Sequence, residues 1–411
     1  MERNARWRVL VDEDRVAVDP SGSVAALAAE DVAGRFPVAP EQLLARDEGP
    51  TVLDVRDLGG VTTGPVPWAP LADVTGPADV REAVRAALRV FHGETRPPDR
   101  RPEWFTAGWR EEVVGWLDHR LAELGRRRTG DEVPVKVWSL SAVLRVPTDG
   151  GPLYLKAACD WFRSEPVITQ LLGRLWPGRV PALLAVEPDR GWQLMAPLAG
   201  VSDEDEPEPG LAAPTAVTIA DMQVGSVAHL AGLRAAGLPE RGLDATWDAL
   251  RAIAVDSPEL RFLDADERAA VRAALPGTER RLAELAALEL PETLVHGDLH
   301  LGNVAHDDGR LSIFDWTDAC LAHPFVDLVT LHGASPEDER PALREAYLDR
   351  WRQELPLPAT DRVMALAAVA EYAFQAVTYE RLQAAQEDAS RWELEGVVAR
   401  CLRRLAEVDA G

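Results

Sequence analysis

Residues 293–316 read TLVHGDLHLGNVAHDDGRLSIFDW, and this stretch interrupts a half of the chain whose other patterns are helical. Two short apolar runs, at 293–295 and 311–314, predict strands on either side of a polar loop. The loop and the end of the second run carry side chains that can bind metals or move protons: His296, Asp298, His300, Asn303 and Asp315. The stretch therefore predicts a functional site inside a helical region.

The spacing of these residues suits phosphoryl transfer. Asp298 and Asn303 are five residues apart, and Asp315 follows Asn303 by twelve. An attacking hydroxyl needs a carboxylate on a short, rigid loop, which orients the hydroxyl and accepts its proton. Mg²⁺ that bridges the phosphates of ATP prefers oxygen ligands, and one carboxylate with one neutral amide oxygen supplies them. An aspartate at a strand end and an asparagine on the neighbouring loop meet both needs.

The same stretch resembles the aminoglycoside phosphotransferase and choline-kinase-like branch of the protein-kinase-like superfamily. HGDLHLGN matches the HGDxxxxN loop of that family, IFDW matches its metal-binding [IV]DW segment, and HPFVDL matches its P-x-x-D-L continuation. The resemblance covers roughly residues 131–400. It implies a bilobal α+β fold of the protein-kinase-like class, with a small antiparallel-sheet N-lobe and a helical C-lobe.

The resemblance also implies cofactors and roles for individual residues. ATP and Mg²⁺ would be the cofactors. Asp298 would be the catalytic base, and His296 would hold the catalytic loop by hydrogen bonds. Asn303 and Asp315 would be the magnesium ligands, and Asp327 would support the C-lobe.

A zinc site is an alternative interpretation of the same region. Five of the eight histidines lie within 37 residues: His296, His300, His306, His323 and His332. No HExxH or CxxC pattern accompanies them, and the loop pattern already accounts for His296. The phosphoryl-transfer interpretation therefore explains more of the sequence.

The pattern upstream, from Val133, predicts the sheet of the N-lobe. Three short β-runs lie at 133–140, 141–148 and 152–158, and the turn Thr148–Gly151 joins the last two as a hairpin. A helix follows at about 164–175 and ends before Pro177-Gly178. Two further strands surround an Asp-Arg-Gly turn within 180–200. Three strands, a helix and two strands are the plan of a kinase N-lobe.

Lys156 and Glu165 are the candidates for holding the nucleotide phosphates. Lys156 ends the run LYLK, and Glu165 opens the next helix. A lysine there could reach the α- and β-phosphates while the helix carboxylate holds it, as the kinase ion pair does. An ordinary surface pair is the alternative interpretation.

Two further segments are candidates for nucleotide binding. The turn between the first two strands contains Ser139 and Ser141 but no glycine, and it resembles the serine-containing loop of aminoglycoside phosphotransferases. Its backbone N–H groups and a hydroxyl could cap a phosphate. The resemblance also makes 195–198 the hinge that contacts adenine through backbone groups of Met195, Ala196 and Leu198. A plain strand end is the alternative there.

The acceptor of the phosphoryl group should lie beside Asp298. Glu371, Gln375 and Tyr379 recur every four residues, on one face of an otherwise apolar helix, and could bond a hydroxylated ligand. A solvated face or a network in the core would give the same pattern. Trp316 and Asp318 are weaker candidates for the same role.

The chain divides into four parts by pattern. Residues 1–100 predict a small α/β domain of unknown role, with strands at 7–11, 15–19 and 51–57 and helices at 24–34 and 77–92. A helical connector at 101–130 follows, with a helix at 104–124. The N-lobe spans 131–199 and the helical C-lobe 200–411. Helical patterns in the C-lobe lie at 215–236, 244–255, 265–288, 340–354, 360–386 and 389–408.

Charge and composition limit the partners and the compartment. The 411 residues carry 44 basic and 68 acidic side chains, a net charge of −24 that repels nucleic acid and anionic membranes. No apolar run is long enough to span a bilayer, and the N-terminus lacks the apolar segment of a secretory signal. The three cysteines lie far apart without a CxxC pair. These features predict a cytoplasmic protein that binds neither nucleic acid nor a membrane, and they leave its oligomeric state open.

The function expected from the sequence is ATP- and Mg²⁺-dependent phosphorylation of a hydroxyl on a small molecule. The acceptor could be an aminoglycoside, an amino sugar, a sugar or a related natural product. A nucleotide-binding sensor that uses the same pocket without transfer is the alternative. A protein kinase is disfavoured because no APE-like segment follows IFDW.

Overall fold

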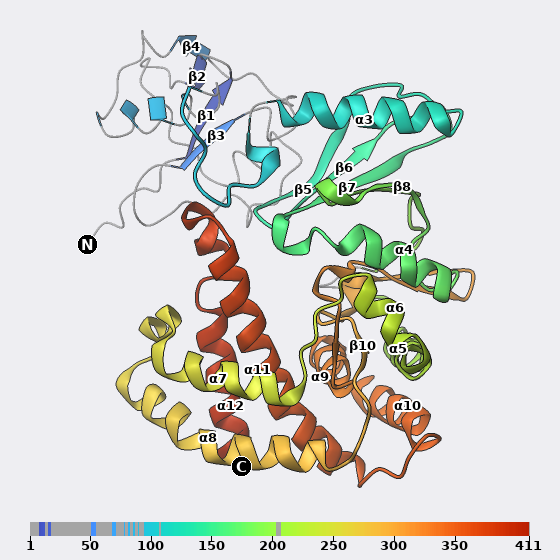
Figure 1. The fold of residues 1–411 in the computed structure, drawn as a ribbon, viewed down its shortest axis with the longest axis vertical. Coiled ribbons are helices and arrows are strands. Elements are labelled where there is room, and N and C mark those ends of the chain that lie inside the picture. Colours follow the sequence, from blue (N-terminus) through green and yellow to red (C-terminus); the bar gives the residue numbers. More distant parts are fainter. Residues whose placement is uncertain are drawn as a thin grey trace. The chain divides into compact units, whose positions relative to one another are not determined.

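A computed structural model of the chain describes residues 94–106, 108–202 and 207–410, four short strands before them, and helical positions at 78, 81–82, 85–86 and 89. The chain forms two compact units (Figure 1). The first unit comprises Met1–Asp160, Trp192–Pro197 and Gln386–Glu393. The second comprises Trp161–Gly191, Leu198–Ala385 and Leu394–Gly411.

The N-terminal part contains a mixed sheet of four strands in the order β3-β1-β2-β4. Its strands are β1 (Arg8–Asp12), β2 (Arg15–Ala17), β3 (Thr51–Asp54) and β4 (Trp68–Pro70). β1 and β3 are parallel, whereas β1–β2 and β2–β4 are antiparallel. The three predicted strands are confirmed, and β4 was not predicted. The predicted helix at 24–34 lies outside the described residues.

Helix α3 (Trp109–Glu123) begins five residues later than the sequence pattern predicts. Residues Glu103–Phe105 form a separate 3₁₀ turn, and Gly108 at the N-cap has φ +86°, which breaks the helical path. The buried tryptophans of this region are packing residues. The ring of Trp192 lies 6.3 Å from that of Trp109 and 5.8 Å from that of Trp116, both edge to face.

An antiparallel sheet of five strands, in the order β5-β6-β7-β9-β8, confirms the predicted strands. Its members are β5 (Val133–Val137), β6 (Ser141–Val146), β7 (Leu153–Ala158), β8 (Leu183–Glu187) and β9 (Trp192–Met195). The turn between β6 and β7 contains Gly151 at φ +93°, a conformation that glycine adopts without strain. Helix α4 (Glu165–Leu175) ends at Trp176, where the chain turns through Pro177 and Gly178.

The second unit is mainly helical. Its helices include α5 (Ala212–Ser226), α6 (Leu230–Ala235), α7 (Leu243–Asp256), α8 (Ala265–Ala286), α9 (Phe325–Ala334), α10 (Arg340–Arg352), α11 (Thr360–Ala385) and α12 (Val397–Ala410). The predicted helix at 215–236 is divided into α5 and α6 by a 3₁₀ turn, because His229 leaves the helical conformation at φ −118° and ψ 7°. Figure 1 shows α11 and α12 side by side, and α11 also packs against α7, α8 and α9.

Two small strand pairs lie among these helices. β10 (Thr293–Val295) pairs antiparallel with β13 (Cys320–Ala322), and β11 (Val304–Asp307) forms a hairpin with β12 (Arg310–Ile313). The sequence predicts β10 and β12, whereas β11, β13 and helix α9 were not predicted. α9 is buried around most of its circumference, so its sequence shows no amphipathic period.

No helix among the described residues is both long and apolar enough to cross a membrane. The three cysteines form no disulfide: Cys320 and Cys401 are buried, and Cys159 is partly buried.

Candidate active site

The backbone of the loop after β10 is held by a side chain from another element, helix α9. The Asp327 carboxylate of α9 accepts from the N–H of His296 at 2.9 Å and from the N–H of Gly297 at 3.0 Å. Gln223 of α5 donates to the same carboxylate at 2.9 Å. Burial raises the pKa of Asp327 to about 7, while its three donors act in the opposite direction. The carboxylate thus ties the loop to α5 and α9.

His296 ties the loop to the end of β12. Its Nε2 lies 2.9 Å from the carbonyl oxygen of Phe314, and its Nδ1 lies 3.3 Å from the backbone nitrogen of Asp298. A carbonyl only accepts, so Nε2 carries the proton and Nδ1 accepts from the Asp298 N–H. The fully buried ring packs 4.7 Å from the ring of Trp316. These contacts describe a neutral imidazole that holds the loop in place.

Asp298 and Asn303 lie on this loop with different exposures. The Asp298 side chain is 47% exposed, whereas Asn303 is 6% exposed. The Nδ2 group of Asn303 donates to the Asp298 carbonyl at 2.9 Å. Since Nδ2 is engaged with the protein, Oδ1 is the end of the amide that remains suited to a cation. The loop therefore combines an accessible carboxylate with an oriented amide oxygen.

Asp315 lies next to Asn303 through the backbone. Phe314, which precedes it, donates its N–H to the Asn303 carbonyl at 3.0 Å. Asp315 has φ +63° and ψ +60°, a left-handed conformation that aspartate tolerates better than most residues. Thr317 donates its hydroxyl to Asp315 Oδ1 at 2.9 Å. The sequence places these two oxygen donors twelve residues apart, and the fold brings their backbones together.

Position 297 accommodates only glycine, because any side chain there would clash with the backbone. Its φ is +88°, and a Cβ at this position would lie 2.6 Å from the carbonyl oxygen of Asp318. We expect Gly297→Ala to lower the free energy of unfolding by about 2–5 kcal/mol, because strain and a backbone clash add. Gly309→Ala is the matched control: its φ is +76°, but no atom lies within 4 Å of the added Cβ. Urea unfolding of both variants measures the difference, and equal losses would exclude the clash.

Helix α11 presents its predicted polar face to the catalytic loop. Gln375 donates to the Gly297 carbonyl at 3.0 Å, and Glu371 accepts from Thr330 at 3.4 Å. The charge of Asp298 contributes to the raised pKa values of Glu371 and Tyr379, in both cases after burial, which is the main cause. Glu371 and Gln375 are 7% and 8% exposed. Gln375 thus supports the loop, Glu371 contacts α9, and these two side chains leave little surface for a ligand.

Glu371 makes stability depend on pH. Burial raises its pKa to about 7 from an ordinary value of 4.5, so between these values the folded protein keeps a proton that the unfolded chain releases. This contribution to stability therefore falls as the pH rises from about 4.5 to about 7. We expect Glu371→Gln to remove that loss, so the variant gains up to about 3 kcal/mol relative to wild type over this window. Urea unfolding at pH 5 and pH 7.5 tests it. The control is Glu354→Gln at an exposed position, and parallel curves for wild type and Glu371→Gln would contradict the prediction.

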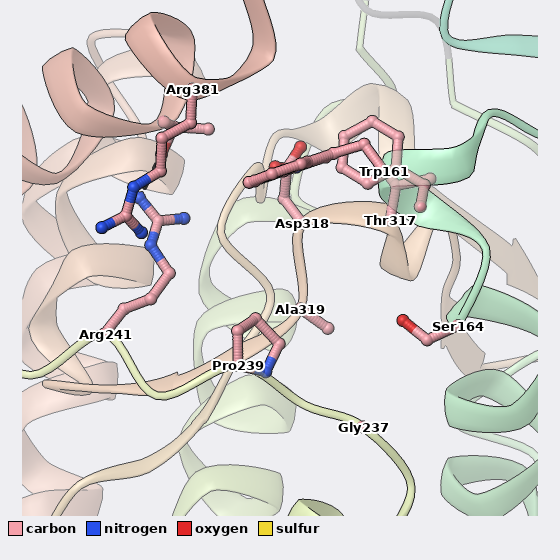
Figure 2. Close-up of a pocket in the computed structure, with 11 residues that line it drawn as sticks. Trp161, Ser164, Gly237, Pro239, Arg241, Thr317, Asp318, Ala319 and Arg381 are labelled. Atoms are coloured by element: carbon pink, nitrogen blue, oxygen red, sulfur yellow. Dashed lines mark hydrogen bonds between the residues drawn. The ribbon is translucent and has the colours of Figure 1, made fainter. Parts of the chain in front are cut away.

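Trp316 and Asp318 differ in their suitability as ligand contacts. Trp316 is fully buried, and its Nε1 donates to the Ile313 carbonyl at 2.9 Å. A side chain with no exposed surface cannot contact an acceptor that arrives from solvent, so we exclude Trp316 from the acceptor site. Asp318 instead lines a pocket of about 230 Å³ in the second unit, together with Trp161, Arg241 and Arg381 (Figure 2). The sequence patterns did not indicate these last three residues, which lie in separate segments without a motif.

The residues expected to bind the nucleotide lie in both units. Lys156 is 6% exposed within β7, opposite Val143 and Gln193 in the neighbouring strands. Glu165, 2% exposed, begins α4 in the second unit, and its ion pair with Lys156 stays a prediction. β9 ends at Met195, and Ala196 still belongs to the first unit, whereas Leu198 begins the next segment of the second unit.

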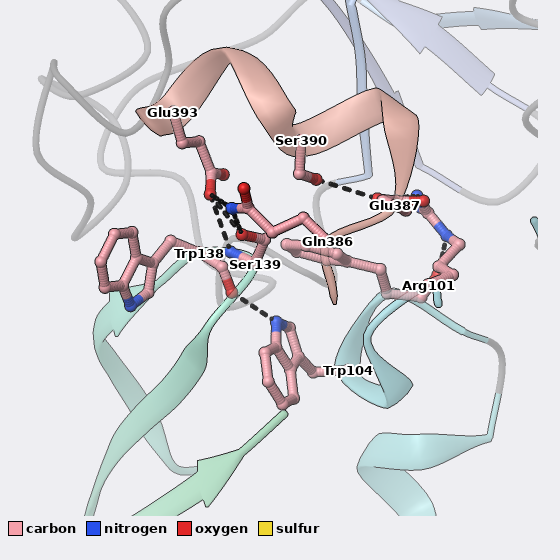
Figure 3. A network of polar contacts seen from close by, with 9 residues as sticks. Arg101, Trp104, Trp138, Ser139, Gln386, Glu387, Ser390 and Glu393 are labelled. Atoms are coloured by element: carbon pink, nitrogen blue, oxygen red, sulfur yellow. Dashed lines mark hydrogen bonds and ion pairs between the residues drawn. The ribbon is translucent and has the colours of Figure 1, made fainter. Parts of the chain in front are cut away.

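Ser139 already has partners within the first unit (Figure 3). Its hydroxyl contacts the Glu393 carboxylate and accepts from Gln386 Nε2 at 2.6 Å, and Gln386 also lies 3.3 Å from that carboxylate. Ser141 accepts from Trp138 Nε1 at 3.0 Å. A phosphate at Ser139 would meet the Glu393 carboxylate, so the phosphate-capping role of these two serines stays a prediction.

The surroundings of Ser139 continue the same network. Trp104 donates its Nε1 to the Trp138 carbonyl at 2.9 Å. Arg101 forms an ion pair with the buried Glu387 at 3.1 Å, and Ser390 donates to Glu387 at 3.0 Å. The network thus fastens the segment Gln386–Glu393 to the turn between β5 and β6, inside one unit.

No three His, Cys, Asp or Glu side chains converge on a possible metal position in the described part of the chain. The zinc interpretation has no structural counterpart there.

The loop and its flanking strands lie within a region that matches a known protein family. The model of the phosphotransferase enzyme family matches residues 129–366, which is 238 of the 411 residues. This chain belongs to the phosphotransferase enzyme family. It is an enzyme of the phosphotransferase class, as the resemblance predicts. No curated protein matches the chain significantly.

Solved structures confirm the protein-kinase-like fold of this phosphotransferase. A choline/ethanolamine kinase family protein from Mesorhizobium loti superposes with a TM-score of 0.50 at 21% identity and covers 73% of this chain and 100% of its own. A protein assigned as a fructosamine-3-kinase from Thermobifida fusca gives a TM-score of 0.50 at 20% identity, with coverage of 72% and 99%. At these identities the similarity concerns the fold alone. The bilobal α+β class expected from the sequence is confirmed.

Proposed function

We propose that this phosphotransferase transfers the γ-phosphoryl group of ATP to a hydroxyl of a small molecule, with Mg²⁺ as cofactor. The observation that carries the proposal is the half-exposed Asp298 carboxylate on a loop that is fixed from three sides. Asp327 holds the loop backbone, His296 holds it to the end of β12, and Gln375 holds it to α11. A rigid loop suits a base that must be positioned before reaction.

Asp298 is the proposed base. Its carboxylate orients the acceptor hydroxyl and takes its proton as the acceptor oxygen bonds to the γ-phosphorus. The bond between that phosphorus and the bridging β,γ-oxygen breaks, and ADP leaves with the electron pair. The products are a phosphate monoester, ADP and one proton, which Asp298 passes to water.

The donor set near the loop fits Mg²⁺. Asn303 offers an amide oxygen whose partner group Nδ2 is engaged, and Asp315 offers a carboxylate oriented by Thr317. One carboxylate and one neutral oxygen leave positions for phosphate oxygens and water, which is the usual arrangement for this ion. The metal, when bound, would neutralise charge on the phosphates.

The nucleotide-binding residues of the proposal come from the resemblance. Lys156 would hold the α- and β-phosphates, oriented by Glu165. Backbone groups of Met195, Ala196 and Leu198 would contact the adenine. The nearly complete burial of Lys156 supports this assignment over that of an ordinary surface pair. The proposal also places the protein in the cytoplasm. It expects neither nucleic acid nor a membrane as a partner, because a net charge of −24 repels both.

The test of the proposal is ADP formation that depends on an added acceptor. Purified enzyme with Mg·ATP is incubated with neutral sugars, amino sugars, sugar acids and aminoglycosides, and ADP release is followed in a coupled assay. We expect at least one acceptor to raise ADP formation well above the rate with water alone. Tight ATP binding without turnover on any acceptor would support the nucleotide sensor instead.

A further inference from the structure

The pocket of Figure 2 differs in charge from the rest of the protein. Its volume is about 230 Å³, and its charged lining residues are Arg241, Arg381 and Asp318. Two arginines and one aspartate give this lining a positive balance, within a chain of net charge −24. All of its lining residues belong to the second unit.

The pocket adjoins the catalytic loop. Asp318 packs against Gly297 so closely that a Cβ on the glycine would lie 3.0 Å from the Asp318 Cβ. Thr317, another lining residue, donates to Asp315. A molecule in the pocket would therefore lie next to the segments that carry Asp298 and Asp315.

Arg241 is a buried cation whose hydrogen bonds are incomplete. It is 9% exposed, and its Nη2 donates to Thr378 Oγ1 at 2.6 Å and to the Phe374 carbonyl at 3.1 Å. Its guanidinium carbon lies 3.6 Å from the centre of the Phe374 ring. Its Nε is buried without a hydrogen-bond partner among the described residues. Burial lowers the pKa of Arg241, since desolvation disfavours the charged form.

Arg381 adds a second positive charge beside the first. Figure 2 shows its guanidinium group on the same side of the pocket as that of Arg241. Repulsion by Arg381 also lowers the pKa of Arg241, whereas attraction by Asp318 raises it. Two neighbouring guanidinium groups attract an anion, because a carboxylate or phosphate accepts hydrogen bonds from them.

Trp161 supplies a different kind of surface at the same pocket. Its side chain is 50% exposed, which is unusual for so large an apolar group. A flat indole face suits a ring, and the Asp318 carboxylate can accept hydrogen bonds from hydroxyls. The lining thus offers surfaces for a ring, for hydroxyls and for an anion.

We propose that this pocket binds the acceptor, and that the acceptor is a hydroxylated ring compound with a carboxylate or phosphate group, which Arg241 and Arg381 hold. The inference rests on the proposed function and narrows it: sugar acids and sugar phosphates are favoured, whereas amino sugars and aminoglycosides place an ammonium group against two guanidinium groups.

Direct binding tests this pocket independently of turnover. Isothermal titration compares glucuronate and glucose 6-phosphate with glucose, glucosamine and inorganic phosphate. We expect the two anionic sugars to bind at least about 10-fold more tightly than the other three probes. Arg381→Glu should weaken their binding at least about 10-fold, since an exposed charge is reversed without disturbing the core. Arg251→Glu is the matched control, with an exposed arginine on α7 outside the lining.

Each contrary outcome overturns the inference. Equal or tighter binding of glucosamine would reverse the charge preference. Equal binding of inorganic phosphate would mean an adventitious ion only, and unchanged binding in Arg381→Glu would place the sugar elsewhere. The same probes in the ADP assay separate the two proposals: preferred turnover of a neutral or amino sugar would sink this inference alone, whereas anion binding without any turnover would sink the proposed function alone.

Discussion

Asp298→Asn should fold normally and bind Mg·ATP, yet lose about 10²–10⁴-fold in kcat, which is typical of the loss of a general base. The substitution keeps the size of the side chain and removes its basicity. The backbone contacts of the loop do not involve the carboxylate: His296 accepts from the Asp298 N–H, and Asn303 donates to the Asp298 carbonyl. Loop geometry should therefore survive.

Asp307→Asn is the control for this experiment. Asp307 ends β11, four residues after Asn303, and its side chain is exposed. We expect wild-type kcat for the control, measured with the best acceptor at saturating Mg·ATP. If Asp298→Asn retains more than half of wild-type turnover, Asp298 is not the base.

Asp315→Ala should abolish the part of nucleotide affinity that depends on Mg²⁺, because the ion loses its carboxylate ligand. We expect the ratio of ATP dissociation constants with EDTA and with Mg²⁺ to fall at least about 10-fold relative to wild type. Alanine at φ +63° also strains the backbone, so Asp315→Asn, which tolerates this conformation, isolates the loss of charge.

Asp308→Ala is the matched control for the strain. Asp308 also has a positive φ, +46°, but it lies in the exposed turn of the β11–β12 hairpin. It should lose a comparable amount of stability and keep the Mg²⁺ dependence of ATP binding. An unchanged Mg²⁺ dependence in both Asp315 variants would contradict the assignment of this ligand. Asn303→Ala should have a milder effect, since a neutral amide contributes less than a charge.

The parts of the fold that sequence predicts are those with strong local patterns. The alternating runs of β5 to β7 and the Asp-Gly-Gly turn predict a hairpin from neighbouring residues alone. The spacing of polar residues on α11 likewise predicts one polar face, and Gln375 on that face contacts the Gly297 carbonyl. Both depend on periods within one segment.

Features that depend on distant contacts were not predicted. β13 has only three residues and forms as a strand by pairing with β10. Helix α9 shows no amphipathic pattern, because most of its surface is buried. Trp316 is a weaker candidate for ligand contact by sequence, but its side chain is fully buried and its ring packs against that of His296. Arg241 and Arg381 are 140 residues apart, so only the fold brings their charges into one pocket.

The partners of Ser139 show the same limit within the first unit. Its carboxylate partner, Glu393, is 254 residues away in a segment that sequence predicts as the start of a helix. The structure instead forms a 3₁₀ segment, Asp388–Leu394, before α12 begins at Val397. Local helical propensity cannot show that this segment packs against the β5–β6 turn, since tertiary contacts decide it.

The most direct test of phosphoryl transfer is a ³¹P NMR spectrum of the reaction of ATP, Mg²⁺ and the best acceptor with wild-type enzyme and with Asp298→Asn. We predict a new phosphate monoester signal that grows with wild-type enzyme as the γ-phosphate signal of ATP declines in equal measure, and almost no such signal with the variant. Loss of the γ-phosphate signal with only inorganic phosphate formed, or the same monoester at the same rate from Asp298→Asn, would contradict the account.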